Sequence, residues 1–338
     1  MYDHTIKTPG DNLMKKALLP LLIASLIPAA AFADVTVYGR ANVALQYADK
    51  NVGDQQYSEL VSNASRIGLK GSEVINDDLK VIYQFEYETK VDDGNNSNNQ
   101  TFAQRNIYLG LQGTGGTVMG GMFDTPLKVS QEKVDLFNDY VGDLKNVLEG
   151  EIRAKNIVQY STPAWGDVTV NLAYVNTEKD VPNADDGYSA SIAYSTKALY
   201  LAVAADTNSK RASDGTLSAV DTDILRAVAR FNIGPVVLGA LWENYDNGVI
   251  DEDGYLVSAQ WNITDAWALK LQTAQSDMIQ LDGQSTSVGV DYKMSKTAKL
   301  YGYYTVVEDK RLNATTLLVD DAARTDDKYF AVGVELNF

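Results

Sequence analysis

Apolar and polar residues alternate along most of the chain, which is the period of a β-strand with one apolar face and one mixed face. Between residues 35 and 47 every second residue is apolar or small, and the residues between them include Arg40 and Gln46. Residues 79–88 and 223–233 repeat the pattern, with charged residues in the middle of the second face. Alternation alone does not separate a soluble sandwich from a membrane barrel, because the strands of both have one apolar face.

The connections between the strands distinguish these two folds. We expect short connections near residues 74–78, 113–116, 163–166, 195–198, 233–235, 263–266 and 294–298, and long ones near 48–60, 90–100, 124–152, 178–187, 206–221, 246–254, 276–284 and 309–327. Short and long connections alternate strictly, and these 15 connections join 16 strands. A membrane barrel has turns at one rim and loops at the other, whereas sandwiches scatter long loops over both ends. The pattern therefore predicts an all-β fold, a 16-stranded antiparallel transmembrane β-barrel.

The chain ends on an alternating strand whose last residue, Phe338, belongs to the apolar face. Contact with lipid, rather than with a protein core, would explain an apolar face that continues to the last residue. We expect the last strand to pair with the first, because a closed ring leaves no open edge in the membrane. After residue 33 no apolar stretch approaches the roughly 18 to 20 residues that a membrane helix needs.

The N-terminal region has the three parts of a secretory signal peptide. Lys15 and Lys16 form a basic start, residues 18–30 are mostly apolar, and small residues precede a cleavage position between Ala33 and Asp34. A membrane anchor is the alternative, but the run is short and contains two prolines. We therefore expect residues 1–33 to comprise an upstream extension and a cleaved signal peptide, and residues 34–338 to form the barrel.

The composition excludes several classes of function for residues 34–338. The chain has no cysteine, and its one histidine, His4, lies before the cleavage position. Disulfides, thiol chemistry, histidine metal sites and histidine-activated hydrolysis are therefore excluded, and we expect no catalytic residue, no metal and no cofactor. A formal net charge of −16 is incompatible with nucleic-acid binding through a basic face. The acidic loops leave open whether they bind divalent cations.

The chain resembles the general porins of Gram-negative bacteria, in the branch of trimeric 16-stranded proteins. The resemblance rests on "SRIGLKGSE" at 65–73, "QRNIYLGLQGTGGTVMGGMFDTP" at 104–126, "IRAKNIVQYSTP" at 152–163 and the terminal "VGVELNF". It implies a homotrimer in the cell outer membrane, in contact with lipid and lipopolysaccharide, with both termini in the periplasm. It also implies that Phe338 is a signal to the barrel-assembly machinery.

The resemblance further implies that the third long loop, residues 124–152, folds inward and narrows the channel. The acids expected on this loop are Asp124, Glu132, Asp135, Asp139, Asp143 and Glu149. The basic wall expected opposite is Arg66, Arg105 and Arg153 by motif, with Arg40, Lys70 and Lys80 added because they lie on the polar faces of their strands. Arg105 falls in the alternating series of residues that should face lipid. We therefore expect a β-bulge between residues 105 and 107, or a position of Arg105 beyond the apolar band.

These observations predict a water-filled channel for passive diffusion of ions and small hydrophilic solutes, without enzymatic activity. The alternatives are a substrate-selective porin, or a non-conducting structural or adhesive barrel. An outer-membrane hydrolase is disfavoured because residues 34–338 contain no histidine. Whether anions or cations pass preferentially is left open, because the loop is acidic and the wall is basic.

Overall fold

The computed structural model describes residues 35–51, 55–94, 99–177, 185–208, 222–279, 281–312 and 319–338. The expected cleavage position at Ala33 and Asp34 lies outside these residues. The strands are β1 (Thr36–Lys50), β2 (Gln55–Ser62), β3 (Arg66–Asn76), β4 (Leu79–Glu88), β5 (Ala103–Gly113), β6 (Gly116–Asp124), β7 (Arg153–Ser161), β8 (Val168–Val175), β9 (Gly187–Ser195), β10 (Leu199–Thr207), β11 (Asp223–Ile233), β12 (Val236–Asp246), β13 (Asp251–Asn262), β14 (Trp267–Ser276), β15 (Leu281–Lys293), β16 (Ala298–Leu312) and β17 (Val319–Asn337).

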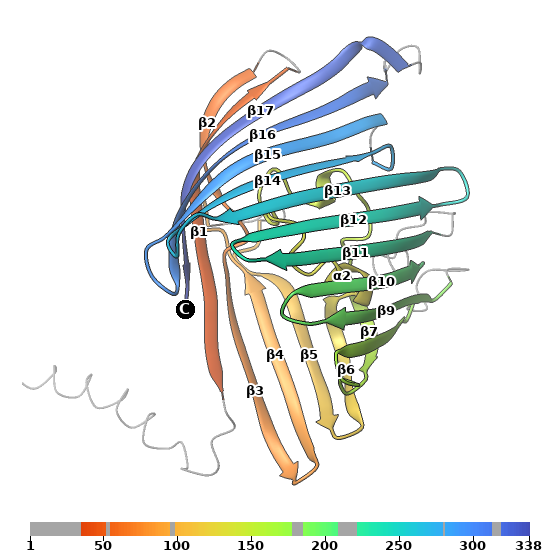
Figure 1. Cartoon of the computed structure of the whole chain (residues 1–338). Coiled ribbons are helices and arrows are strands. Elements are labelled where there is room, and N and C mark those ends of the chain that lie inside the picture. Colours follow the sequence, from red (N-terminus) through yellow and green to blue (C-terminus); the bar gives the residue numbers. More distant parts are fainter. Residues whose placement is uncertain are drawn as a thin grey trace, which may run out of the picture.

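The strands form one closed antiparallel sheet (Figure 1). β2 and β3 both pair with β1, so these two segments occupy one position in the wall and the 17 segments of the described chain make 16 barrel strands. The break between them lies at residues 63–65, where Ala64 has a φ of 49°. The predicted 16-stranded barrel is therefore confirmed.

The first and last strands close the ring, as predicted. β1 pairs with β17 over ten registered pairs that run from Arg40 opposite Asn337 to Asp49 opposite Lys328. Beyond the pair of Arg40 and Asn337, the backbones of Gly39 and Phe338 exchange two hydrogen bonds of 2.8 and 3.1 Å. A side chain at position 39 would collide with the Phe338 ring, so glycine gives the terminal ring its space.

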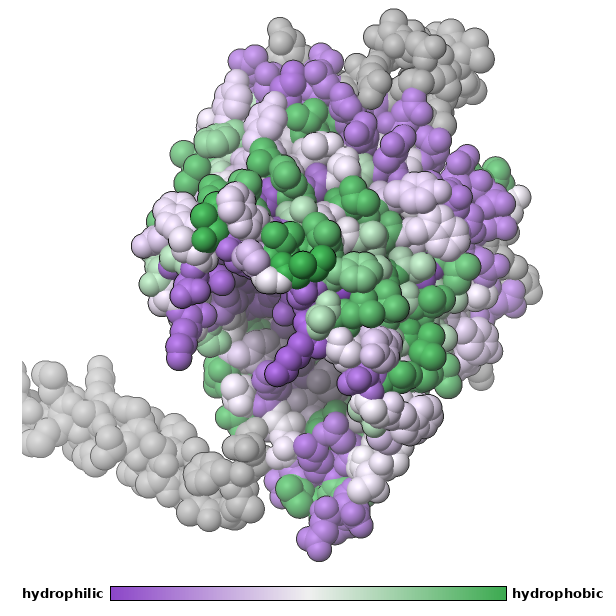
Figure 2. Space-filling view, viewed as in Figure 1, coloured by the Kyte–Doolittle hydropathy of each residue, from purple (hydrophilic) through white to green (hydrophobic). Residues whose placement is uncertain are grey.

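The two faces of the wall have the composition that alternation predicts. On β11, Leu225 is 43% exposed and points outward, whereas the neighbouring Arg226 is fully buried. Figure 2 shows apolar residues gathered over the strands and polar residues concentrated towards the strand ends. In the described part of the chain, none of the helices has the length and hydropathy required to span a bilayer.

Several hairpins are longer than the sequence pattern predicts. β16 and β17 extend to Leu312 and from Val319, through most of the connection expected at residues 309–327. β13 begins at Asp251, inside the connection expected at 246–254. The acidic and polar residues predict loops here, but the backbone pairing of the strands continues through them.

The connection between β6 and β7, residues 125–152, contains the short helices α2 (Pro126–Ser130) and η1 (Leu144–Asn146). Thr125 caps α2, and Pro126 occupies its first turn, where no backbone N–H is needed. This segment packs against strand faces that carry polar residues. Its Leu127, Val134 and Leu148 join buried residues of β10 to β14 in an apolar cluster. The mixed face of the strands therefore carries apolar as well as polar residues in this part of the wall.

Candidate functional site

A cavity of about 670 Å³ separates the segment 125–152 from strands β3 to β7. Its volume is in the range of sites for small molecules. Its charged lining consists of seven cations, Arg66, Lys90, Arg105, Lys128, Lys133, Lys145 and Arg153, and seven acids, Glu86, Glu88, Asp124, Glu132, Asp139, Asp143 and Glu151. This balance differs sharply from the net charge of −16 on the whole chain, so total charge does not describe the environment of a solute here.

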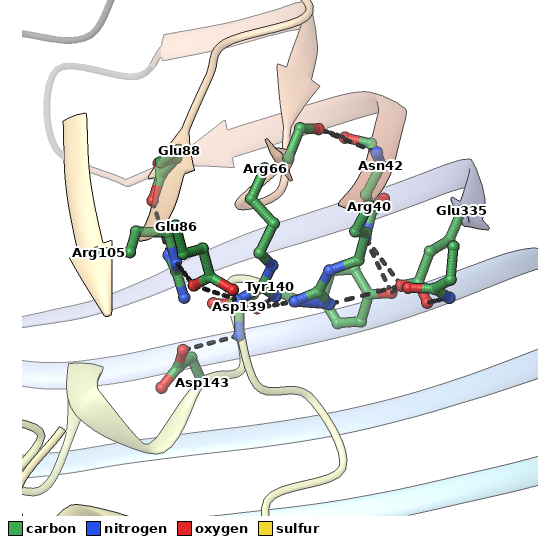
Figure 3. A network of polar contacts seen from close by, with 12 residues as sticks. Arg40, Asn42, Arg66, Glu86, Glu88, Arg105, Asp139, Tyr140, Asp143 and Glu335 are labelled. Atoms are coloured by element: carbon green, nitrogen blue, oxygen red, sulfur yellow. Dashed lines mark hydrogen bonds and ion pairs between the residues drawn. The ribbon is translucent and has the colours of Figure 1, made fainter. Parts of the chain in front are cut away.

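Two arginines of the wall converge on one carboxylate of the segment (Figure 3). Arg40 on β1 and Arg66 on β3 place their Nη2 atoms 2.5 and 3.1 Å from Oδ2 of Asp139. Asp139 has a φ of 70°, and its backbone N–H donates a hydrogen bond of 2.8 Å to Asp143. The segment and the wall are therefore in direct contact at this point, with no gap between acid and cation.

Arg105 lies beside this group because of a β-bulge. Phe85 pairs with Ile107 and Tyr87 with Gln104, so β5 has one extra residue opposite β4. The bulge turns Arg105 away from the outward face that its parity implied, which confirms the predicted explanation. Its guanidinium then binds Glu86 at 2.9 Å and Glu88 at 2.8 Å.

Arg153 occupies the other end of the cavity wall. Its Nε lies 3.0 Å from Oδ1 of Asp124 and donates to Asn106 at 3.0 Å. Lys128 of α2 binds the same Asp124 oxygen at 3.3 Å. A second bulge, between Gly121 and Phe123 in the pairing of β6 with β7, precedes this group. Asp124 therefore joins a wall arginine to a lysine of the segment.

Not all the expected acids face the cavity. Asp135 is buried and accepts hydrogen bonds from the backbone of Phe137 at 2.9 Å and Leu144 at 3.0 Å. Burial, with the nearby Asp143 carboxylate as a second cause, raises the pKa of Asp135 to about 7. Asp143 lines the cavity but also caps η1, and Glu149 is not part of the lining. Through these hydrogen bonds, Asp135 and Asp143 stabilise the shape of the segment as well as contributing to its charge.

Three expected wall residues are not part of the cavity lining: Arg40, which reaches Asp139 from β1, Lys70 and Lys80. Lys70 is exposed, with its ammonium group 5.1 Å from the centre of the Tyr38 ring. Lys80 lies next to the short turn between β3 and β4 and lines a separate surface hollow there. Lys70 and Lys80 both lie on the predicted face of their strands. However, the alternation of residues specifies only the face and not the position along the strand.

The sequence reasoning missed several charged partners. Glu86 and Glu88 were recognised only as polar-face residues of their strand, although Arg66 is registered directly opposite Glu88. Arg226, one of the charged residues on the second face of residues 223–233, is fully buried and binds Glu243 at 2.6 Å and Glu151 at 2.9 Å. Opposite charges on the same face of consecutive strands could have indicated both of these groups of charged residues.

The segment is fixed to the wall by an extended set of contacts. Tyr200 donates to the Ser130 carbonyl at 3.0 Å, and Ser258 donates to the Val134 carbonyl at 2.6 Å. Gln272 binds both Asp135 and the Gly142 carbonyl, at 2.8 and 3.0 Å. Phe137 and Tyr140 pack on Tyr301 and Tyr303 of β16 in a second buried cluster, whose members are Ala44, Phe137, Tyr140, Tyr301, Tyr303 and Ala331. Among the described residues, the cavity of about 670 Å³ lies on the other side of the segment, towards β3 to β7.

Among the described residues, no group of three or more acidic, histidine or cysteine side chains is arranged to hold a metal ion. The acids of the cavity instead bind arginine and lysine. Such a lining can orient and screen charged solutes.

Comparison with known proteins gives consistent matches. A family model described as Gram-negative porin matches residues 20–312. Outer membrane porin protein 32 of Delftia acidovorans is 28% identical over 333 residues, covering 90% of this chain and 92% of that protein. The major outer membrane protein P.IB of Neisseria sicca is 30% identical over 188 residues, which cover 51% of this chain and 50% of that protein.

Solved structures share the fold at lower identity. The anion-selective porin from Comamonas acidovorans has a TM-score of 0.74 at 21% identity, covering 90% of this chain and all of that chain. OmpF of Salmonella typhi, solved in complex with daunomycin, has a TM-score of 0.68 at 17% identity, with 90% and 98% covered.

Proposed function

Because the chain belongs to the Gram-negative porin family and forms an outer-membrane channel for passive diffusion, we propose that it is not an enzyme and that the segment 125–152 folds into this channel and sets its width. The observation that carries the proposal is the cavity of about 670 Å³ between the segment and β3 to β7. On the opposite side the segment buries apolar side chains against the wall, which leaves solutes the polar cavity as their route.

We propose that the charged groups of the cavity form the narrowest part of this route. Arg66, Arg105 and Arg153 supply the wall charges, and Lys128 and Lys133 supply cations from the segment. Hydrated ions and small polar solutes exchange water for these groups at little cost, whereas apolar solutes must displace ordered water. A substrate-selective porin remains the second candidate, and the comparison with an anion-selective porin supports a preference for anions.

We further propose that the chain works as a homotrimer with both termini in the periplasm. A solved relative from Vibrio cholerae is described in a trimer form. In this proposal residues 1–33 are removed on export, residues 34–338 form the barrel, and Phe338 signals to the barrel-assembly machinery. The outward apolar side chains contact lipid, and the polar rims contact lipopolysaccharide and water.

The absence of cysteine makes the route testable by single-cysteine labelling. Lys133→Cys places a thiol on the exposed cavity side of the segment, and Asp253→Cys places one on an exposed position of β13. A bulky methanethiosulfonate reagent should reduce single-channel current in the first variant and leave it unchanged in the second. Equal currents before and after complete labelling at position 133 would contradict the proposed route.

A further inference from the structure

A hollow of about 520 Å³ lies on the outer face of the wall, over the neighbouring strands β14 to β17. Its apolar lining includes Trp267, Val290, Tyr292, Leu300, Tyr304 and Val332, and we call it the outer hollow. These side chains belong to the outward face of their strands, so the wall separates the outer hollow from the polar cavity inside the barrel.

The floor of the outer hollow is Gly302, in the middle of β16. It is registered between Val290 of β15 and Val332 of β17, and it lies between the outward side chains of Leu300 and Tyr304 along its own strand. Glycine weakens a strand interior, and it usually marks a bulge, a positive φ or the close approach of a ligand. The pairing is regular here, and the φ of Gly302 is not positive.

The packing of the chain itself does not require glycine at position 302. A Cβ atom built there would come no nearer than 3.6 Å to the atoms around it, which is an ordinary contact distance. The lining side chains stand above this floor on all four sides. A slender alkyl chain can therefore reach Gly302, whereas the wall of a second barrel would rest on the side chains around it.

The outer hollow begins at the rim of the short turns. Trp267 is the first residue of β14 and is registered opposite Tyr292 near the end of β15, and the two ring centroids are 4.6 Å apart. Aromatic rings at the rim of a barrel mark the interface between membrane and water. At about 3.4 Å per residue, the lining from Leu300 to Tyr304 extends about 14 Å along β16. One leaflet supplies about half of the roughly 30 Å hydrocarbon core, so the hollow lies within the leaflet at this rim.

We propose that the outer hollow is a lipid-binding site, which holds one acyl chain of a phospholipid from the leaflet at the short turns. Asn337 donates a hydrogen bond to the Thr297 carbonyl in the turn between β15 and β16, so the C-terminus lies at the same rim. The inference rests on the proposed periplasmic position of the termini, because the leaflet on that side consists of phospholipid and lipopolysaccharide occupies the other. A chain that fills the hollow makes dispersion contacts that a void would lose.

The turn beside the outer hollow also offers a partner for the lipid head group. Lys296 lies in the turn between β15 and β16, is exposed, and forms no ion pair with any residue that the structure describes. Basic residues at the edge of the hydrocarbon region attract anionic head groups. An anionic phospholipid thus fits the site at both its ends, with the phosphate at the turn and an acyl chain over Gly302.

Quenching of tryptophan fluorescence by a brominated lipid tests the site. The chain has four tryptophans, so Trp165→Phe, Trp242→Phe and Trp261→Phe together leave Trp267 alone, at the edge of the outer hollow. This single-tryptophan protein, folded in detergent micelles, is titrated with phosphatidylglycerol that carries bromine in its acyl chains. We expect a component of quenching that saturates at one lipid per chain, above the linear quenching by lipid dissolved in the micelle.

Gly302→Leu fills the floor of the hollow and should abolish the saturable component. Gly120→Leu is the matched control: Gly120 of β6 is registered between the outward Leu109 and Val158, and the nearest atoms to a Cβ there are 3.7 Å away. Val290→Phe fills the same hollow from β15 and replaces Gly302→Leu if that variant does not fold. Lys296→Gln should raise the lipid concentration needed for half-saturation without changing the capacity.

Quenching that is only linear in the single-tryptophan protein would overturn the inference, and so would saturable quenching retained in both filled variants. An equal loss in Gly120→Leu would also overturn it, because the effect would then not belong to the hollow. Loss of oligomers in Gly302→Leu with unchanged quenching would assign the hollow to a second copy instead. Single-channel current should be the same in Gly302→Leu and the wild type, which separates this inference from the proposed route of solutes. Heat-modified electrophoretic mobility establishes that each variant is folded.

Discussion

Arg66 and Arg153 line the same cavity from β3 and β7, but different acids hold them, Asp139 and Asp124. We predict that Arg66→Ser and Arg153→Ser each shift the reversal potential in a salt gradient toward cation selectivity. The reason is that each change removes a permanent positive charge and leaves its acid less neutralised. Lys80→Ser is the control, since Lys80 lies away from the cavity. An unchanged reversal potential in both arginine variants would place these residues outside the route.

Individual side chains could be assigned from the sequence only where strand periodicity applies. Parity placed Arg40, Arg66 and Arg226 on the inner face, and the conflict at Arg105 correctly indicated a bulge. Parity could not give height along a strand, and so it included Lys70 and Lys80. Within the segment 125–152 no period exists, so the sequence could not show that Asp135 is buried while Asp139 reaches the wall.

At the scale of elements, the segment 125–152 depends on one buried charge group. Arg226 and Glu243 are both fully buried, and Arg226 also binds Glu151 and the Glu149 carbonyl, which holds the end of the segment to β11 and β12. Arg230 makes a comparable pair with Glu132, but their side chains are 15% and 29% exposed. The two pairs therefore differ mainly in their access to water.

We predict that Arg226→Gln lowers the free energy of unfolding by about 3–5 kcal/mol, because it leaves Glu243 buried without its partner. Arg230→Gln should cost only about 0–1 kcal/mol, as is usual for pairs open to water. Urea unfolding followed by tryptophan fluorescence in detergent compares the two variants. The single-channel current of Arg226→Gln should also become noisier, as one end of the segment is released. Equal destabilisation by both changes would mean that burial does not distinguish these pairs.

The sequence predicted the strands better than it predicted the packing of the segment 125–152 against them. Strand number, pairing order and closure all followed from alternation and connection length, which depend on local chemistry. The apolar cluster between the segment and the wall did not follow from alternation or connection length. Ile224, Val228 and Leu256 share the inner face with charged residues, where they pack in one cluster with Leu127 and Val134 of the segment. Contacts between residues about 100 positions apart leave no periodic signal.

For the whole molecule, the proposed trimer makes a prediction about conductance. Purified protein should insert into planar bilayers in steps of three equal, ohmic conductance levels, because three separate channels enter together. Crosslinking in detergent should give a species of three chains under the same conditions. Insertion in single, independent steps, with one chain after crosslinking, would contradict the trimer and leave the barrel itself unaffected.

The seam between β1 and β17 has a consequence for folding. The N–H and C=O of Gly39, near the start of β1, bond with those of Phe338, directly after β17. A chain without β17 would therefore leave one edge of β1 and one edge of β16 unpaired. Unpaired edges can pair with strands of other chains, so the ring is protected from aggregation only when its first and last strands have met.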